Sequence, residues 1–179
     1  MNITETEAMR QELLERMVKD FNEIYIAAAI AEDQPPGTPV IVRVILDEIG
    51  DPDDDAFGEY YFTPISEDDN VQYFNAIITI TEDIPEDRLP SLYEVMSYIN
   101  FTIPAGCFAI DKDHNFLSYR LTLPMPLSTG REQIYEFMNI AAGNSAAVTD
   151  AYMGVFTDII KGRMSPGEVI YLLGGNEKD

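Results

Sequence analysis

Residues 104–124, PAGCFAIDKDHNFLSYRLTLP, decide how the fold is interpreted, because they hold the only cysteine and the only histidine of the chain, Cys107 and His114. A thiol, an imidazole and nearby carboxylates at this spacing are compatible with a catalytic or metal site. Apolar residues nevertheless recur at every second position on both sides of residues 111–115, which is the period of a β-strand. The pattern predicts a β-hairpin with residues 117–123 packed inward and His114 in the turn, pointing to water.

The predicted hairpin separates Cys107 from His114, which argues against a catalytic pair. We expect a buried or half-buried thiol that packs as a small apolar group. Residues 111–115 also match the Asp-x-Asp-x-Asn opening of a calcium loop. That match ends there, because Phe116 stands where the loop needs glycine and Thr122 where it needs glutamate. The aspartates and asparagine are therefore expected to serve the geometry of the turn.

The remaining polar candidates offer weaker signals. The acidic run at residues 51–55 is typical of a hydrated loop, with weak cation binding as the alternative. Glu59 and Asp158 are expected to face solvent from a strand and a helix. Arg43 and Arg120 each interrupt a predicted strand, and we expect each to pair with an acid in the sheet rather than to clamp a ligand. The sequence therefore predicts no catalytic, cofactor-binding or metal-binding residues.

Length and composition predict an ordinary globular protein. The chain has 179 residues, of which 46% are hydrophobic, and we expect residues 1–179 to form a single domain. One cysteine excludes an intramolecular disulfide, and the acidic N-terminal stretch is unlike a secretory signal. No apolar run approaches the ~20 residues that span a bilayer. These features predict a cytoplasmic protein without a membrane segment.

The charge balance restricts the possible partners. Acidic residues number 32 and basic residues 11, which gives a formal net charge of −21. A phosphate backbone would be repelled over most of such a surface, so nucleic acid is not expected as a partner. Two explanations stay open: the acidity serves solubility alone, or the protein binds a basic or amphipathic polypeptide segment.

The N-terminal half predicts one helix followed by strands. Residues 5–19 form an amphipathic pattern with Met9, Leu13 and Met17 on one face and Glu and Arg on the other, after a Thr4/Glu7 capping box. Enrichment in β-branched and aromatic residues then predicts four strands, at residues 21–31, 39–46, 58–65 and 71–81. Their connections are too short for parallel crossovers, so an antiparallel meander is expected.

The C-terminal half predicts helices on either side of the hairpin. One covers residues 90–100, and a longer one runs from a Thr129/Glu132 capping box to Ile159, with a possible break near Gly143. Ser165 and Glu168 form a capping box for a short final helix. This order predicts an α+β fold, with an antiparallel sheet of about five to six strands and helices packed on one face.

Several segments resemble the bacterial YbjN-type family, at residues 92–100, 104–111, 117–124, 159–162 and 165–168. Members of this family are described as sensory transduction regulators, and their fold is similar to the acidic chaperones of type III secretion. Over about residues 85–173, the resemblance implies a type III secretion chaperone-like α+β domain, often dimeric, with no catalytic residues to carry over. The strand-rich segment 24–81 is longer than the family leads us to expect.

Together these features predict a non-enzymatic, acidic, chaperone-like or regulatory protein. It would form a homodimer, through the long third helix or a sheet edge, and hold a partner polypeptide along apolar grooves surrounded by acid. Eight methionines would suit an adaptable surface, although methionine is equally common as core filler. The alternatives are a carboxylate- or metal-dependent hydrolase with a site assembled from distant positions, and a sensor that binds a small ligand between helix and sheet.

Overall fold

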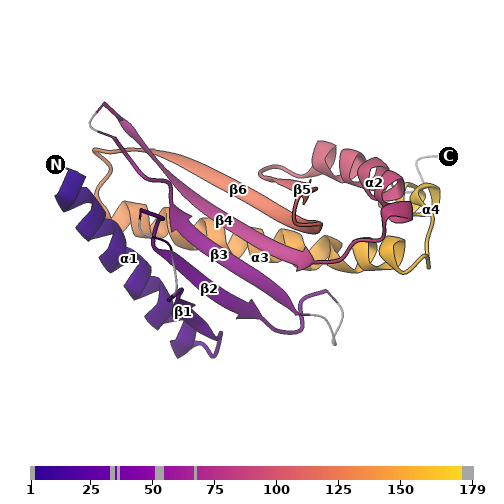
Figure 1. Cartoon of the computed structure of the whole chain (residues 1–179), viewed down its shortest axis with the longest axis horizontal. Helices are drawn as coiled ribbons and strands as arrows, with labels where there is room; N and C mark the ends of the chain where they lie inside the picture. Colours follow the sequence, from indigo (N-terminus) through magenta and orange to yellow (C-terminus); the bar gives the residue numbers. More distant parts are fainter. Residues whose placement is uncertain (1–2, 33–34, 36, 51–54, 67, 175–179) are drawn as a thin grey trace.

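The computed structural model describes residues 3–32, 35, 37–50, 55–66 and 68–174. Within these ranges six strands form one antiparallel sheet in the order β1-β2-β3-β4-β6-β5 (Figure 1). The strands are β1 (Ala28–Ile30), β2 (Ile41–Leu46), β3 (Ala56–Phe62), β4 (Val71–Thr81), β5 (Cys107–Asp111) and β6 (Phe116–Pro126). The helices are α1 (Ile3–Glu23), α2 (Leu89–Thr102), α3 (Arg131–Ile160) and α4 (Pro166–Leu173), with a 3₁₀ turn, η1, at Glu86–Arg88.

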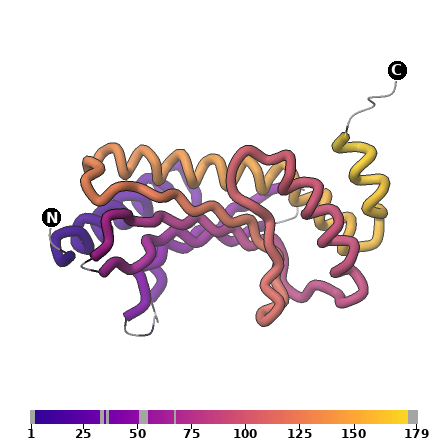
Figure 2. Tube along the Cα trace, turned by 90° about the horizontal axis from the view of Figure 1, so that it is seen from above, coloured from indigo at the N-terminus to yellow at the C-terminus, as the bar shows by residue number. Residues whose placement is uncertain are grey.

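The sheet and the helices form two layers. Alternate side chains of the strands, such as Val44, Tyr60 and Phe74, are buried beneath α1 and α3, which cover the same face (Figure 2). The period-two pattern therefore produces one buried face, as an antiparallel sheet with helices on one side requires. Helices α2 and α4 pack against each other at one end of the sheet, and α2 also contacts β5 (Figure 1). The predicted fold class is confirmed.

The first helix extends further than predicted. Residues 21–23 belong to α1, and of the expected strand at residues 21–31 only Ala28–Ile30 is a strand. Tyr25 ends the helix in the left-handed conformation, with φ of 66°. The N–H groups of Tyr25 and Ile26 donate to the carbonyls of Asn22 and Phe21, which is the Schellman arrangement of a helix C-terminus. Glycine usually occupies the left-handed position of this arrangement, so a tyrosine there does not reveal the end of the helix in the sequence.

The capping boxes differ in their outcomes. The Ser165 box is confirmed, because the Ser165 N–H donates to Glu168 Oε2 at 2.8 Å and the Ser165 side chain accepts from the Glu168 N–H. The Thr129 box is wrong, since Gly130 is the N-cap of α3 and makes no side-chain cap. Thr4 lies inside α1. Helix α3 runs unbroken through Gly143 to Ile160, because its packing along the sheet compensates for the local preference of glycine.

Arg10 was expected on the polar face of the first helix, but it is buried, with 2% of its surface exposed. Its Nε donates to Gln72 Oε1 at 3.1 Å, and its Nη1 donates to Glu7 Oε1 at 2.9 Å and to the Thr63 carbonyl at 3.2 Å. The guanidinium also lies 5.0 Å from the centre of the Phe62 ring. Burial lowers the pKa of Arg10 below its ordinary value, against the opposing effect of Glu7. Arg10 therefore joins α1 to β3 and β4.

The two edge strands are protected in the same way. The Asn22 side chain donates to the Ala28 carbonyl at 2.9 Å and accepts from the Ala28 N–H at 3.2 Å, at edge strand β1. The Asn100 side chain does the same with Phe108 of edge strand β5, at 3.0 and 2.7 Å. In each case a side-chain amide takes the place of a neighbouring strand. We call these two contacts the asparagine clasps; they satisfy backbone groups that would otherwise be open to another chain.

Replacing Asn100 with alanine is expected to lower the free energy of unfolding by about 1–3 kcal/mol, because the N–H and carbonyl of Phe108 lose their partner. The exposed edge of β5 should also cause concentration-dependent self-association. Denaturant unfolding and light scattering over a range of concentrations test both effects. Asn70→Ala is the matched control, because Asn70 is exposed and its side chain makes no hydrogen bond to another residue that the structure describes. Equal behaviour of the two variants would contradict the role of the clasp.

Candidate binding face

The hairpin of β5 and β6 is confirmed, and it separates the two candidate catalytic groups. Cys107 begins β5, whereas His114 lies in the turn before β6 with 73% of its side chain exposed. The expectation of a buried or half-buried thiol is wrong, because Cys107 is exposed. Cys107 pairs with Arg120, whose side chain points away from the helices, while the next residue, Phe108, points into the core. The thiol and the imidazole therefore do not converge on one point.

Asp111 organises the turn of this hairpin. Its carboxylate accepts the N–H groups of Asp113 at 2.9 Å and His114 at 3.1 Å, and lies 3.1 Å from His114 Nδ1. These hydrogen bonds, led by that of the His114 side chain, hold the pKa of Asp111 below its ordinary value. Asn115 adopts φ of 57° and donates from Nδ2 to the Ile84 carbonyl at 3.1 Å. The residues that match the opening of a calcium loop, Asp111, Asp113 and Asn115, therefore stabilise the turn of the hairpin, as predicted.

The other acidic candidates do not assemble into a metal site among the described residues, where no group of three histidine, cysteine, aspartate or glutamate side chains lies close enough to hold an ion. Residues 51–54 of the acidic run lie outside the described ranges. Asp158 faces solvent and lies 3.4 Å from Arg163 at the end of α3. Asp158 therefore contributes to a surface ion pair.

The face of the sheet opposite α1 and α3 carries no helix, and we call it the open face (Figure 1). Its side chains come from alternate positions of four strands: Ile41, Arg43, Ile45, Phe57, Glu59, Tyr61, Tyr73, Ile77, Thr79 and Arg120. Phe57 is 56% exposed, and Ile45 and Tyr73 are also exposed. Most soluble domains bury such a row of apolar side chains, so an uncovered one indicates an interaction surface.

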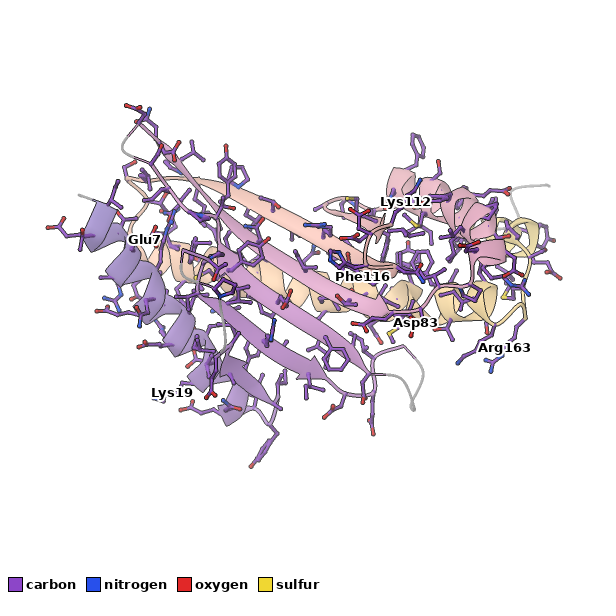
Figure 3. All side chains as sticks on the ribbon, in the orientation of Figure 1. Glu7, Lys19, Asp83, Lys112, Phe116 and Arg163 are labelled. Carbon is purple, nitrogen blue, oxygen red and sulfur yellow. The ribbon has the colours of Figure 1, made fainter. Side chains whose placement is uncertain are left out.

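A groove of about 840 Å³ lies on the open face. It is lined mainly by β1, β2 and β3, including Ile45 and Phe57, and Glu82 and Phe116 also belong to its lining. Phe116 stands at the start of β6, where the β5–β6 hairpin projects from the side of the sheet opposite α3 (Figures 2 and 3). The groove is therefore a mainly apolar depression that includes Phe116 at the base of the projecting hairpin.

The two strand arginines behave differently. Arg43 Nε lies 2.9 Å from Glu59 Oε1, so its predicted pairing with an acid in the sheet is confirmed. Arg120 is exposed, and no carboxylate of the described chain lies within ion-pair distance of it, so the same prediction is wrong for Arg120. The strand register places Glu59 opposite Ile77, and Ile77 opposite Arg120. The open face thus carries one neutralised and one uncompensated guanidinium.

A second cavity, of about 590 Å³, lies between α1 and the sheet. Leu14, Val40 and Phe62 line it together with Arg10 and Glu7. This is the kind of place where a small-ligand sensor would bind its ligand. The charge of Arg10 is balanced by Glu7, and its Nε and Nη1 donate to Gln72, Glu7 and Thr63, whereas the buried Nη2 has no hydrogen-bond partner among the described residues.

The methionines do not form the predicted adaptable surface. All seven that the structure describes lie in the core or pack against it: Met9, Met17, Met96, Met125, Met138, Met153 and Met164. The core-filler interpretation therefore fits them. Exposed aromatic and aliphatic side chains of the open face take the place that the methionines were expected to occupy.

In the described part of the chain, no helix has the length and apolar character needed to cross a membrane.

The sequence pattern did not identify the open face. Strand β3 reads AFGEYYF, with aromatic residues at both parities, so periodicity alone cannot say which of Phe57 and Tyr60 points inward. Gly58 indicates which face of β3 is packed against the helices. A Cβ at this position would lie close to Val44 and Tyr60, so the Gly58 face is the tightly packed one. Phe57, as the neighbour of Gly58, must then point outward.

Comparison with known proteins gives a likeness of fold. No family model matches the sequence, and no curated protein matches it. Among solved structures, the chain is similar to YbjN from E. coli, described as a candidate transcription regulator, with 14% identity and a TM-score of 0.44. The similarity covers 78% of this chain and 90% of YbjN. Membership of the YbjN-type family stays a prediction.

Proposed function

We propose that this chain is a non-enzymatic binding protein that holds an extended polypeptide segment on its open face. The observation that carries the proposal is the row of exposed apolar side chains, with Phe57 56% exposed beside a groove of about 840 Å³. Covering these side chains removes apolar surface from water, which favours association by about 25 cal/mol per Å² before the costs of binding. A partner of matching shape would gain most at Phe57, the most exposed of these side chains.

Two further features favour a polypeptide that lies across the sheet rather than one that adds a strand to it. Each edge strand is covered by an asparagine clasp at one residue, Ala28 or Phe108, so strand addition there would first have to displace Asn22 or Asn100. The open face, in contrast, needs no rearrangement. The same clasps disfavour a homodimer through the sheet edge, and homodimerisation by another surface stays a prediction. Nothing favours the carboxylate- or metal-dependent hydrolase alternative, because among the described residues no group of three histidine, cysteine, aspartate or glutamate side chains could hold a metal ion.

Capture of partners from a lysate of the source organism tests this proposal. The tagged wild-type protein is compared with Phe57→Ser and with Phe101→Ser, which replaces a 90% exposed phenylalanine near the end of α2. Wild type and Phe101→Ser are expected to recover the same proteins at two ionic strengths, and Phe57→Ser is expected to lose them. Recovery of one identical set by all three proteins, or of nothing by any, would refute binding at the open face.

A further inference from the structure

We infer that the segment held on the open face is acidic as well as apolar, and that one of its carboxylates pairs with Arg120. This inference rests on the proposed function. It differs from the expectation given by the net charge of −21, which favours a basic partner. The argument depends on where the charges of the open face lie.

Arg120 does not line the groove, but it stands in the path of a segment that leaves the groove at β3 and crosses the open face over β4 to β6. It lies across from Ile77 on β4 and from Cys107 on β5, within the exposed side of the sheet. A covering apolar segment would remove water from the Arg120 guanidinium. Burial of an unpaired charge is costly, whereas a carboxylate at hydrogen-bond distance compensates for the lost water. No carboxylate of the described chain fills this role, so the incoming segment must supply it.

No other charged side chain of the open face requires a partner of opposite charge from the bound segment. The Arg43 guanidinium is already paired with Glu59 at 2.9 Å, and Glu82, which also lines the groove, follows the end of β4. The strands themselves thus expose two guanidinium groups and one carboxylate, in a chain that is acidic elsewhere. Salt screens distant charges beyond a Debye length of about 8 Å at physiological ionic strength. Contacts at Arg120 therefore decide the charge preference more than the overall field does.

Strand geometry gives the spacing of the bound segment. Arg120 on β6 lies two strands away from Phe57 and Glu59 on β3, with β4 between them. Two strand spacings amount to roughly 10 Å, which an extended chain crosses in about three residues. The bound segment should therefore place an apolar anchor in the groove beside Phe57 and a carboxylate about three residues away.

Selection from a random twelve-residue peptide library tests this inference at physiological ionic strength. Peptides are selected on the wild-type protein, and those that also bind Phe57→Ser are discarded. The remaining peptides are expected to carry Asp or Glu about three residues from an apolar anchor. Each should also slow the alkylation of Cys107, the only cysteine of the chain, because Cys107 neighbours Arg120 across β5 and β6.

Charge-reversal variants then locate the contact. Arg120→Glu should weaken the selected acidic peptides by at least about tenfold, because like charges would meet at the contact. Lys161→Glu is the matched control, since it makes the same change in net charge at an exposed position beyond α3, two residues before Arg163 (Figure 3). This control should leave binding unchanged.

The outcomes separate this inference from the proposed function. Neutral or basic peptides that depend on Phe57, or equal weakening by Arg120→Glu and Lys161→Glu, would overturn the acidic partner while leaving polypeptide binding intact. A selection that yields no peptide dependent on Phe57 would overturn both.

Discussion

Replacing Arg10 with alanine is expected to lower the free energy of unfolding by about 2–4 kcal/mol, because neutral groups and not a buried charge lose their partner. The substitution removes the N–H groups that donate hydrogen bonds to Gln72 Oε1 and to the Thr63 carbonyl. The buried oxygen of the Gln72 amide then has no partner. It also opens a space against Phe62, which the guanidinium now faces. A broken buried polar network costs more than a lost surface contact, because the remaining groups have neither water nor a partner. Denaturant unfolding at neutral pH measures the change.

Arg16→Ala is the matched control for Arg10. Arg16 lies on the same helix and pairs with Glu132 at 2.9 Å, but its side chain is 42% exposed. A surface ion pair contributes about 1 kcal/mol or less, so this variant should lose far less stability. If the two alanine variants lose similar amounts, Arg10 does not hold α1 to the sheet in the way described.

Replacing Phe156 with alanine is expected to lower the free energy of unfolding by about 3–5 kcal/mol. Phe156 is fully buried on α3, and its ring centre lies 4.7 Å from that of Phe108 on β5. Phe108 in turn packs against Tyr119 of β6 at 5.2 Å and Tyr152 of α3 at 5.9 Å. This aromatic cluster fastens the β5–β6 hairpin to the long helix. The variant should therefore also speed the alkylation of Cys107, by loosening the start of β5.

Phe101→Ala is the matched control for Phe156→Ala. Phe101 is 90% exposed, so its removal should change the free energy of unfolding by no more than about 0.5 kcal/mol. Unfolding curves give the stabilities, and a thiol reagent gives the alkylation rates under native conditions. A Phe156→Ala protein that is destabilised but keeps the wild-type alkylation rate would show that the cluster stabilises α3 without holding the hairpin.

Much of the fold could be predicted from local patterns. The bounds of β4 agree with the predicted strand at residues 71–81, and the hairpin from Cys107 onward follows from strict alternation about a polar turn. These segments have one strong period and clear turn residues, so local and tertiary preferences agree. The order of the elements then led to the α+β class, since short connections exclude parallel crossovers.

The remaining features depend on tertiary contacts that a pattern does not contain. Arg10 lies three and four residues before Leu13 and Leu14, on the buried face of α1, and its burial follows from Gln72, which is 62 residues away. Tyr25 ends α1 without the glycine that usually signals such an end. Arg120 has the same sequence setting as Arg43, yet only Arg43 meets a carboxylate, because Glu59 stands opposite it in the register.

The asparagine clasps affect which contacts can form while the chain is still being synthesised. Asn22 precedes Ala28 by 6 residues and Asn100 precedes Phe108 by 8, so both contacts close very short loops at low entropic cost. Each amide leaves the ribosome before the strand that it covers, and β5 emerges before its true neighbour β6. The outer edges at Ala28 and Phe108 can therefore be covered before the inner neighbours β2 and β6 have been made, and they stay covered in the finished sheet.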